Sequence, residues 1–245
     1  MKTLVRLEIT RTLRNKKFMF FSVIYPPALY LIIAGRNSTA EMPGLAIDMK
    51  LYYMVAMAAF GAITAVLMGN SERIAKERET GWVRQLRLTA LPGRGYVTAK
   101  IASAATVSLP SILLVLVTGA AVMGVRLEAW QWVAVALCSW AGSFVFAALG
   151  VAIGYLATGD AVRPITMLCY FGLAFMGGLW LPSSSLPGWV QDIGEWLPTH
   201  AYIALGQAVE AGDAPHAGDA GLLLAYLVLF ASAAAWLYRK DTRTA

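Results

Sequence analysis

Six long apolar runs that contain no Asp, Glu, Lys, Arg or His constrain the fold of this chain most strongly. They cover residues 18–34, 51–69, 101–123, 130–156, 165–181 and 221–237. A helix of roughly 20 apolar residues crosses a hydrocarbon core about 30 Å thick, because it pairs every backbone N–H and C=O internally. Charged residues make up only 14% of the chain, whereas soluble domains have about 25%. The sequence therefore predicts an all-α polytopic membrane protein, with residues 1–245 forming a single transmembrane domain of six helices.

Lysine and arginine are concentrated on one side of these runs. The segment up to Lys17 carries six of the 20, the connection 70–100 carries seven, the connection around Asp160 one and the tail after Leu237 three. The remaining three lie in two of the other three connections. The positive-inside rule then makes both termini and the connection 70–100 cytoplasmic, in a multi-pass protein of the cell membrane. The net charge of +6 follows from this topology and needs no nucleic-acid partner.

The basic segment 1–17 is typical of a helix lying in the cytoplasmic membrane interface. Val5, Ile9 and Leu13 are spaced for one helical face and are flanked by cations, which anionic headgroups attract. A basic anchor that only fixes topology is the alternative. A cleaved signal peptide is disfavoured, because the basic segment is long and no small-x-small pattern closes the first run.

Prolines and glycines mark special positions inside two of the runs. Pro26 and Pro27 interrupt the first run, and because proline removes a backbone donor, we expect a helix kink that neighbouring helices cover. Gly150 and Gly154 form a G-x-x-x-G pattern, which allows two helix backbones to approach closely. We expect this packing within the chain, with a contact between two copies as the alternative.

The connection before the last run carries five acids and no Lys or Arg. Its segment 183–212 predicts an extracytoplasmic helix pair: an amphipathic helix that Pro198 ends, then a second helix that Thr199 caps and that runs towards Gly212. The apolar face of the first helix holds Trp189, Ile193 and Trp196. We expect the pair to form a lid or an exit lining, with plain anchoring in the outer membrane interface as the alternative.

The connection 70–100 is the most highly charged part of the chain. Opposite charges four residues apart indicate that the second run continues into the cytoplasm as a solvated helix, which Gly81 weakens. Beyond it, Trp82 and Leu86 alternate with cations such as Arg87. An exposed segment with an apolar and a cationic side more often signals a docking surface than a simple connection.

The stretch KERETGWVRQLRLTALPGRGYVTAK, residues 76–100, resembles the signature of the ABC type-2 transporter permease family. The matching residues are Glu77, Arg78, Glu79, Gly81, Leu86, Arg87, Leu91, Pro92, Tyr96 and Lys100. GGLWLPSSSLPGWVQDIGEWLPTHAYIAL resembles the other recurring stretch of the family, and the layout of the runs matches over nearly the whole chain. Ala90 departs from the Thr-Pro-Leu of many relatives, which leaves the resemblance intact.

The resemblance implies that the connection 70–100 is a coupling loop seated in a separate ATP-hydrolysing subunit. Glu77, Arg78 and Glu79 would orient it through ion pairs, next to Gly81 and Arg87, while Trp82 and Leu86 would supply buried contact. ATP and Mg²⁺ would then belong to the partner subunit. Two permease chains, identical or different, would act with two ATPase chains. A solvated charge cluster without a partner is the alternative.

An ATPase activity in this chain itself is not expected. A P-loop requires Gly-Lys followed by Ser or Thr, and Gly-Lys occurs nowhere in the sequence. The two histidines, His200 and His216, have no metal-ligand spacing, so we expect neither catalysis nor a metal or cofactor site. An ion-coupled carrier would place an ionisable residue in the membrane, which the runs lack. A non-transporting resistance or sensor protein stays open.

The apolar runs suggest a hydrophobic or amphipathic cargo. Adaptable Met and aromatic side chains favour an antibiotic, a drug, a lipid or a lipopeptide over a sugar or an ion. Polysaccharide export, which other branches of the resembled family perform, stays open.

Overall fold

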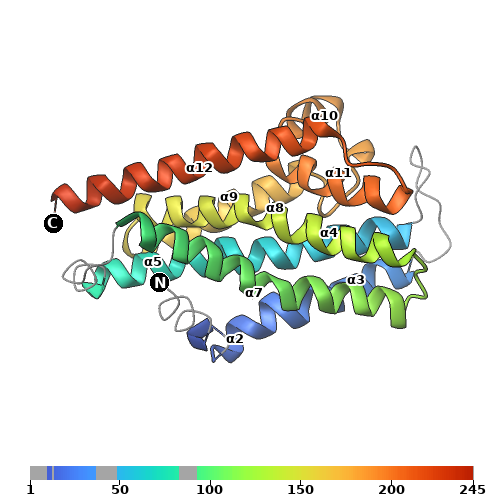
Figure 1. Cartoon of the computed structure of the whole chain (residues 1–245), viewed down its shortest axis with the longest axis horizontal. Helices are drawn as coiled ribbons and strands as arrows, with labels where there is room; N and C mark the ends of the chain where they lie inside the picture. The colour runs from blue at the N-terminus through green and yellow to red at the C-terminus, as the bar shows by residue number, and fades with distance from the viewer. Residues whose placement is uncertain (1–9, 13, 37–48, 83–92, 245) are drawn as a thin grey trace.

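The computed structural model of the chain describes residues 10–12, 14–36, 49–82 and 93–244, and the structural statements below concern these residues. Within them the chain is helical and contains no strand. The elements are α2 (Lys16–Met19), η1 (Phe20–Ile24), α3 (Tyr25–Arg36), α4 (Met49–Ile63), η2 (Thr64–Met68), α5 (Gly69–Glu79), α7 (Gly93–Ala121), α8 (Ala129–Leu156), η3 (Gly159–Ala161), α9 (Val162–Met176), η4 (Ser183–Ser185), α10 (Gly188–Gly194), α11 (Pro198–Ala211) and α12 (Ala217–Thr244). The long helices run side by side along one axis (Figure 1). We call the two ends of this bundle the Met49 end and the Glu79 end, after the residues at which α4 begins and α5 ends.

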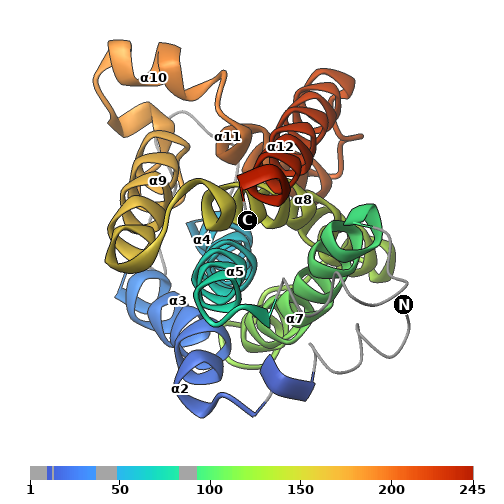
Figure 2. The ribbon, with the colours of Figure 1, turned by 90° about the vertical axis from the view of Figure 1, so that its left-hand side faces the viewer.

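One continuous helix, formed by α4, η2 and α5, lies at the centre of the bundle. It has 31 residues, and 89% of its most apolar 18-residue window is buried, against 11% for α12. Viewed along the axis, α3, α7, α8, α9 and α12 surround it (Figure 2). Its small residues, Ala56, Ala58, Ala59, Gly61 and Ala62, allow the neighbouring helices to approach closely. The outward side of α12 is thus free to face lipid, while the central helix is covered by protein.

The described residues contain five helices that are long and apolar enough to cross a membrane. They are Lys16–Gly35, Met49–Glu79, Lys100–Ala121, Ala129–Leu156 and Ala217–Asp241. The run 165–181, expected to form another span, folds into α9, which has only 15 residues. Gly178 follows with a φ of 85°, a conformation that ends a helix and favours glycine. The all-helical, multi-pass fold is confirmed, whereas the sixth span stays a prediction.

The first long helix contains a π-helical segment directly before its two prolines. η1 covers Phe20–Ile24, and the chain continues through Pro26 and Pro27 as α3. A wide turn accommodates backbone carbonyls that a proline cannot pair. Pro26 packs at Gly61 of α4, where a Cβ atom would lie 2.8 Å from its Cγ.

Gly150 and Gly154 of α8 lie against the central helix of the same chain. A Cβ at Gly150 would lie 2.8 Å from the carbonyl oxygen of Leu67, and one at Gly154 would lie 2.8 Å from the Cβ of Ile74. Since real Cβ atoms essentially never come so close to other heavy atoms, both positions require glycine for this packing.

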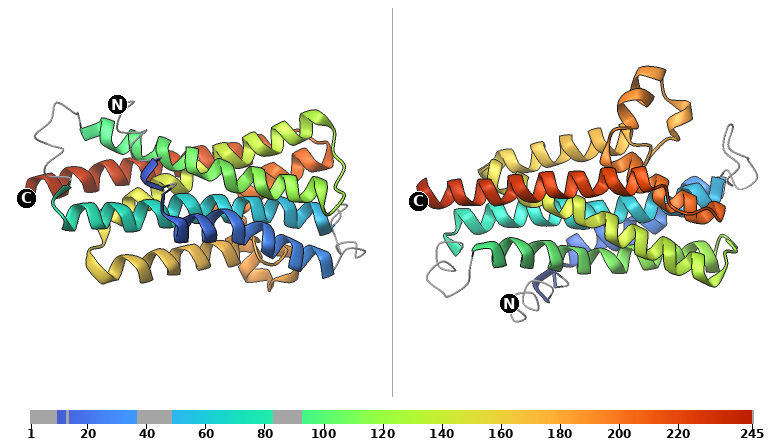
Figure 3. Two further views of the ribbon diagram at one scale, coloured as in Figure 1. Left: turned by 90° about the horizontal axis from the view of Figure 1, so that it is seen from below. Right: turned by 45° about the horizontal axis from the view of Figure 1, so that its top comes forward.

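The segment 183–212 contains two helices, but their limits differ from those expected. α10 ends at Gly194, and Pro198 occupies the first turn of α11, where its missing N–H needs no partner. The predicted Thr199 cap is wrong: Leu197 is the N-cap, and the Thr199 hydroxyl donates to the carbonyl of Leu173 in α9 at 2.7 Å. α10 projects from the side of the bundle (Figure 3), whereas α11 packs against α4, α8 and α12.

Candidate functional site at the Glu79 end

The last turn of α5 carries three charged residues in succession, Glu77, Arg78 and Glu79. Successive residues of a helix point about 100° apart, so the three side chains reach different neighbours. The helix ends where the Thr80 hydroxyl donates to the carbonyl of Lys76 at 2.9 Å and Gly81, with a φ of 72°, turns the chain.

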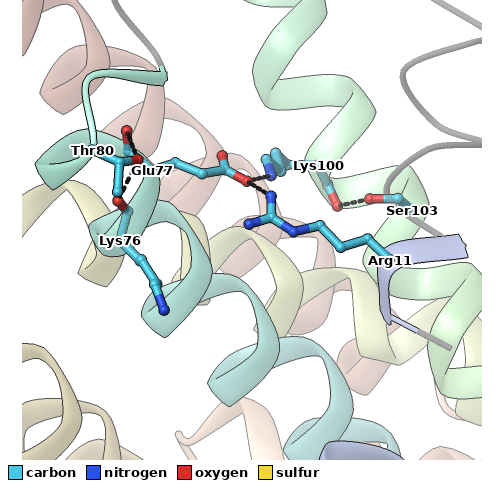
Figure 4. A network of polar contacts seen from close by, with 6 residues as sticks. All are labelled: Arg11, Lys76, Glu77, Thr80, Lys100 and Ser103. Carbon is cyan, nitrogen blue, oxygen red and sulfur yellow. Dashed lines mark hydrogen bonds and ion pairs between the residues drawn. The ribbon is translucent and has the colours of Figure 1, made fainter. Parts of the chain in front are cut away.

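Glu77 forms a buried ion pair with Lys100 of α7. Its Oε1 lies 2.7 Å from Nζ of Lys100 and 3.4 Å from Nη1 of Arg11 (Figure 4). The side chains of Glu77 and Lys100 are only 2% and 1% exposed. Two buried charges require each other, because removing either leaves the other without compensation away from water. The pair therefore fixes α5 to α7.

Arg78 connects α5 with the ends of two other helices. Its Nη2 lies 2.7 Å from Oδ1 of Asp241 in α12. Its Nη1 donates to the carbonyls of Gly154 and Ala157, both at 3.1 Å, and its guanidinium lies over the ring of Tyr155. These carbonyls at the C-terminal end of α8 lack partners within the helix and carry the negative end of its dipole. Arg78 therefore donates hydrogen bonds to the free carbonyls at the end of α8 and also forms the ion pair with Asp241 of α12.

Glu79 reaches the connection between α8 and α9. Its Oε1 accepts a hydrogen bond of 2.7 Å from the backbone N–H of Gly159, the first residue of η3. The N–H groups at the start of a helical segment have no partner within it, and the Glu79 carboxylate accepts from one of them. We call Arg11, Glu77, Arg78, Glu79, Lys100 and Asp241 the α5 junction.

The α5 junction brackets the connection between α5 and α7. The described chain continues to Trp82 after α5 and resumes at Gly93, where α7 begins. Glu77, Arg78 and Glu79 lie before this connection, and Lys100 lies after it. The helix expected to continue the second run is confirmed as α5, but the expectation that it is solvated is wrong, because Ile74, Ala75 and Glu77 are buried. They pack beneath the end of α8 and against α7 and α9. This end of α5 thus contacts α7, α8 and α9 and, through Arg78, α12.

The predicted coupling residues are distributed unevenly around the junction. Glu77, Arg78 and Glu79 contact residues of this chain. Trp82 is 37% exposed and follows the turn at Gly81. Leu86 and Arg87 lie outside the described residues, as do Val5, Ile9 and Leu13 of the expected interfacial helix. The action of these residues on a partner stays a prediction.

Sequence reasoning missed the partners that complete the junction. Lys100 appeared only as a matching residue at the start of the third run, and its place directly before an apolar run was the available signal. Asp241 is the one acid of a basic tail, which was a weaker signal. Arg11 appeared only as one of several cations in the N-terminal segment.

The three aromatic and aliphatic residues predicted for the outer helix pair share an exposed surface. Trp189 and Trp196 are 66% and 72% exposed, and Ile193 is also exposed. The side of α10 that is buried instead contains Val190 and Gly194. Trp189 and Ile193 lie on α10, which projects from the bundle, and Trp196 lies in the turn that follows it, as fits an interfacial position.

The acids, histidines and cysteines of the described residues form no metal-binding cluster. Among these residues, no group of three or more His, Cys, Asp and Glu is placed to hold a metal ion. Cys138 and Cys169 are free thiols on separate helices.

Comparison with known proteins places the sequence among transporters. Residues 43–237 match the sequence pattern of the family described as "ABC-2 family transporter protein". The chain is also 29% identical over 234 residues to YvfS of Bacillus subtilis (strain 168), whose name describes it as a transport permease. That match covers 96% of this chain and 95% of YvfS.

Proposed function

Because the chain belongs to the ABC-2 transporter family, we propose that it is the permease subunit of an ATP-driven exporter whose ATP is hydrolysed by a separate subunit. The α5 junction is the observation that carries this proposal. It ties the segment next to Trp82 to the first part of α7, to the ends of α8 and α12 and to η3 before α9, through buried or hydrogen-bonded charges. A subunit that pushes on this segment would move several helices together.

The partner surface would consist of Trp82 and the adjoining connection to α7, with Leu86 and Arg87. Glu77, Arg78 and Glu79 would act behind this surface by holding its base, since their carboxylates and guanidinium are engaged within the chain. ATP and Mg²⁺ would bind to the partner, and this chain would need no cofactor. A second permease chain, identical or different, would complete the pathway.

In the membrane, the Glu79 end and both termini would face the cytoplasm. The distribution of Lys and Arg supports this orientation. α9, at about 1.5 Å per residue, would cross as a short sixth span together with the residues that follow Met176. The Met49 end and α10 would then face the outside, where Trp189, Ile193 and Trp196 would lie at the membrane interface as a lid or an anchor.

The cargo would be a hydrophobic or amphipathic compound, such as an antibiotic, a drug, a lipid or a lipopeptide. The exposed apolar side chains on α3, α9 and α12 support entry from the bilayer, because they leave the helices in direct contact with lipid chains.

The first test is co-purification of the full-length permease with the product of its neighbouring gene. A bound partner that contains a P-loop is expected, and the complex should then move an apolar fluorescent compound across proteoliposomes only when ATP is supplied. A partner variant without the P-loop lysine is the matched control.

Collapse of the proton gradient at constant ATP separates this proposal from its rivals. Continued flux is expected. Flux that stops with the gradient would indicate an ion-coupled carrier, and a complex that moves no compound while still conferring resistance would indicate a non-transporting protein.

A further inference from the structure

Glu210, near the end of α11, is a buried acid without a partner. Its side chain is only 6% exposed, and neither carboxyl oxygen has a hydrogen-bond partner in the structure. Burial raises the pKa of this carboxyl well above its ordinary value. A buried polar group without a partner is rare in folded proteins and calls for an explanation.

Nearby polar groups are already engaged with other partners. Gln131 of α8 uses its Nε2 to donate to the backbone carbonyls of Val209 and Glu210, at 3.0 and 3.3 Å. Its Oε1 accepts from the backbone N–H of Glu128 at 2.8 Å. The Glu128 carboxylate in turn accepts from the indole of Trp130 at 2.6 Å. The backbone carbonyls of Val209 and Glu210 thus have a donor, whereas the Glu210 carboxyl has no partner.

A second open group lies one helical turn before this acid. The Nε2 of Gln207 is buried and has no hydrogen-bond partner. Residues three apart lie on the same face of a helix, so the side chains of Gln207 and Glu210 leave α11 on the same side. One accepts hydrogen bonds and the other donates them.

The charge around this pair favours a cation. The last turn of a helix carries the negative end of the helix dipole, and Glu210 lies in the last turn of α11. Residues 182–219 contain five acids and no Lys or Arg, which raises the local concentration of cations. A metal ion fits poorly, because it would have one carboxylate next to an amide donor and no further ligand group among the described residues.

We propose that Glu210 and Gln207 form a binding site for the protonated amine of a cationic amphiphilic compound. The ammonium would pair with the Glu210 carboxylate, and a carbonyl or hydroxyl oxygen of the same compound would accept from Gln207. The interpretation of this site as a cargo site rests on the transport role proposed above. It narrows the proposed cargo to organic amines. Both groups lie on α11, which is not among the candidate spans and packs between the central helix, α8 and α12.

The binding step is balanced by the release of one proton. In the empty site, burial raises the pKa of the carboxyl and so favours its protonated form. When the ammonium enters, the carboxyl gives this proton to water and becomes the charged partner of the amine. No other bond forms or breaks. The amine keeps its own proton throughout, so a neutral analogue lacks the pairing charge.

The test uses the full permease–ATPase complex in lipid nanodiscs without ATP. The probe is dansylcadaverine, an apolar fluorophore with a protonated amine, and its N-acetylated neutral form is the paired control. The wild-type complex should bind the amine about 10-fold or more tightly than the neutral form, the size of one charge-assisted hydrogen bond. Glu210→Gln should remove this preference, and Glu195→Gln, an exposed acid of the same region, should retain it.

Infrared difference spectra provide a readout that a purely structural role would not change. Addition of the amine to the wild-type complex should remove a protonated-carboxyl C=O band, and Glu210→Gln should lack this signal while melting at the same temperature or higher. A wild-type complex without preference for the amine, or a Glu210→Gln complex that keeps it, would overturn the site. Since binding needs no ATP, amine binding that depends on Glu210 without ATP-driven flux would contradict the transport role and leave the site intact.

Discussion

The carboxylate of Glu77 and the ammonium of Lys100 lie 2.7 Å apart although 23 residues separate them in the sequence. The ion pair joins the end of α5 to the first part of α7, on either side of the connection that we propose to meet the ATPase. Removing one partner of a buried ion pair costs about 3–5 kcal/mol, because the other charge stays buried alone. The pair is therefore both a structural bond and the base of the proposed coupling surface.

Replacing Lys100 should unfold the protein at lower temperature. Lys100→Met keeps the length of the side chain but removes the ammonium that lies 2.7 Å from the Glu77 carboxylate, so we expect a loss of roughly 3–5 kcal/mol. The double variant Glu77→Gln with Lys100→Met should recover much of this loss. Thermal unfolding in detergent measures both, with Lys76→Met, an exposed lysine, as the control. A double variant less stable than Lys100→Met would contradict this account.

Arg78→Ala should destabilise the protein more than Asp241→Asn. The alanine removes the ion pair and also leaves the carbonyls of Gly154 and Ala157 without their donor, whereas the asparagine removes only the charge of one partner. Each lost charge-assisted bond is worth roughly 1.5–3 kcal/mol. Denaturant midpoints should follow the order wild type, Asp241→Asn, Arg78→Ala. Equal midpoints for the two variants would show that the carbonyl contacts contribute nothing.

Gly154→Ala should separate α8 from the central helix. The added Cβ would lie 2.8 Å from the Cβ of Ile74 and 3.0 Å from the carbonyl oxygen of Ser71, and overpacking of this kind costs about 1–3 kcal/mol. Gly172→Ala in α9 is the matched control, because a Cβ there meets nothing within 4 Å. The control should be neutral or more stable by up to about 1 kcal/mol. A harmless Gly154→Ala would contradict the close contact.

Glu210→Gln should stabilise the protein at neutral pH and have little effect in acid. Burial raises the pKa of the folded carboxyl, so above its unfolded pKa of about 4.3 the unfolded chain loses a proton that the folded chain keeps. Ionisation thus favours unfolding, increasingly so until the pH reaches the folded pKa. The melting temperature of the variant should exceed that of wild type by a margin that grows as the pH rises above about 4.3. Glu195→Gln serves as control, and a margin constant across this range would refute the shift.

Trp82→Ala should weaken association with the ATPase subunit without destabilising the permease. The indole is 37% exposed beyond the end of α5, and truncating an aromatic anchor at an interface costs at least about 1–2 kcal/mol, roughly a tenfold loss of affinity. Trp189→Ala, exposed on α10 at the other end of the protein, is the control and should leave association unchanged. Binding is measured by titrating the ATPase subunit into permease nanodiscs.

The overall architecture could be predicted because the membrane restricts the chain to few solutions. Apolar runs such as 51–69 lie within long helices, since charge-free segments of that length have no other stable form in lipid. The extent of α9 could not be predicted, because hydropathy does not register the positive φ of Gly178 that ends its run early. Hydropathy also carries no information on whether a proline ends one helix or begins the next, so it did not show that Pro198 begins α11.

The sequence did not show which residues the charged side chains contact in the folded protein. Opposite charges four residues apart suggested a solvated helix, but tertiary packing buries Glu77 against Lys100. Reversing the charge of Glu77, an obvious test of coupling from sequence, would place two cations side by side in a buried site and confound coupling with folding. Glu210 follows Tyr202 and Gly206 at helical spacing on the packed face of α11, and this position was the available signal of its burial.

The unbroken course of the central helix from Met49 to Glu79 has a practical consequence. At about 1.5 Å per residue its 31 residues extend about 46 Å, longer than the roughly 30 Å of hydrocarbon that it crosses. A stiff rod of this length carries a shift at one tip to the opposite tip. A fluorophore attached near Met49 should therefore report, in real time and from the opposite end of the bundle, each movement that the proposed ATPase partner imposes at Glu79.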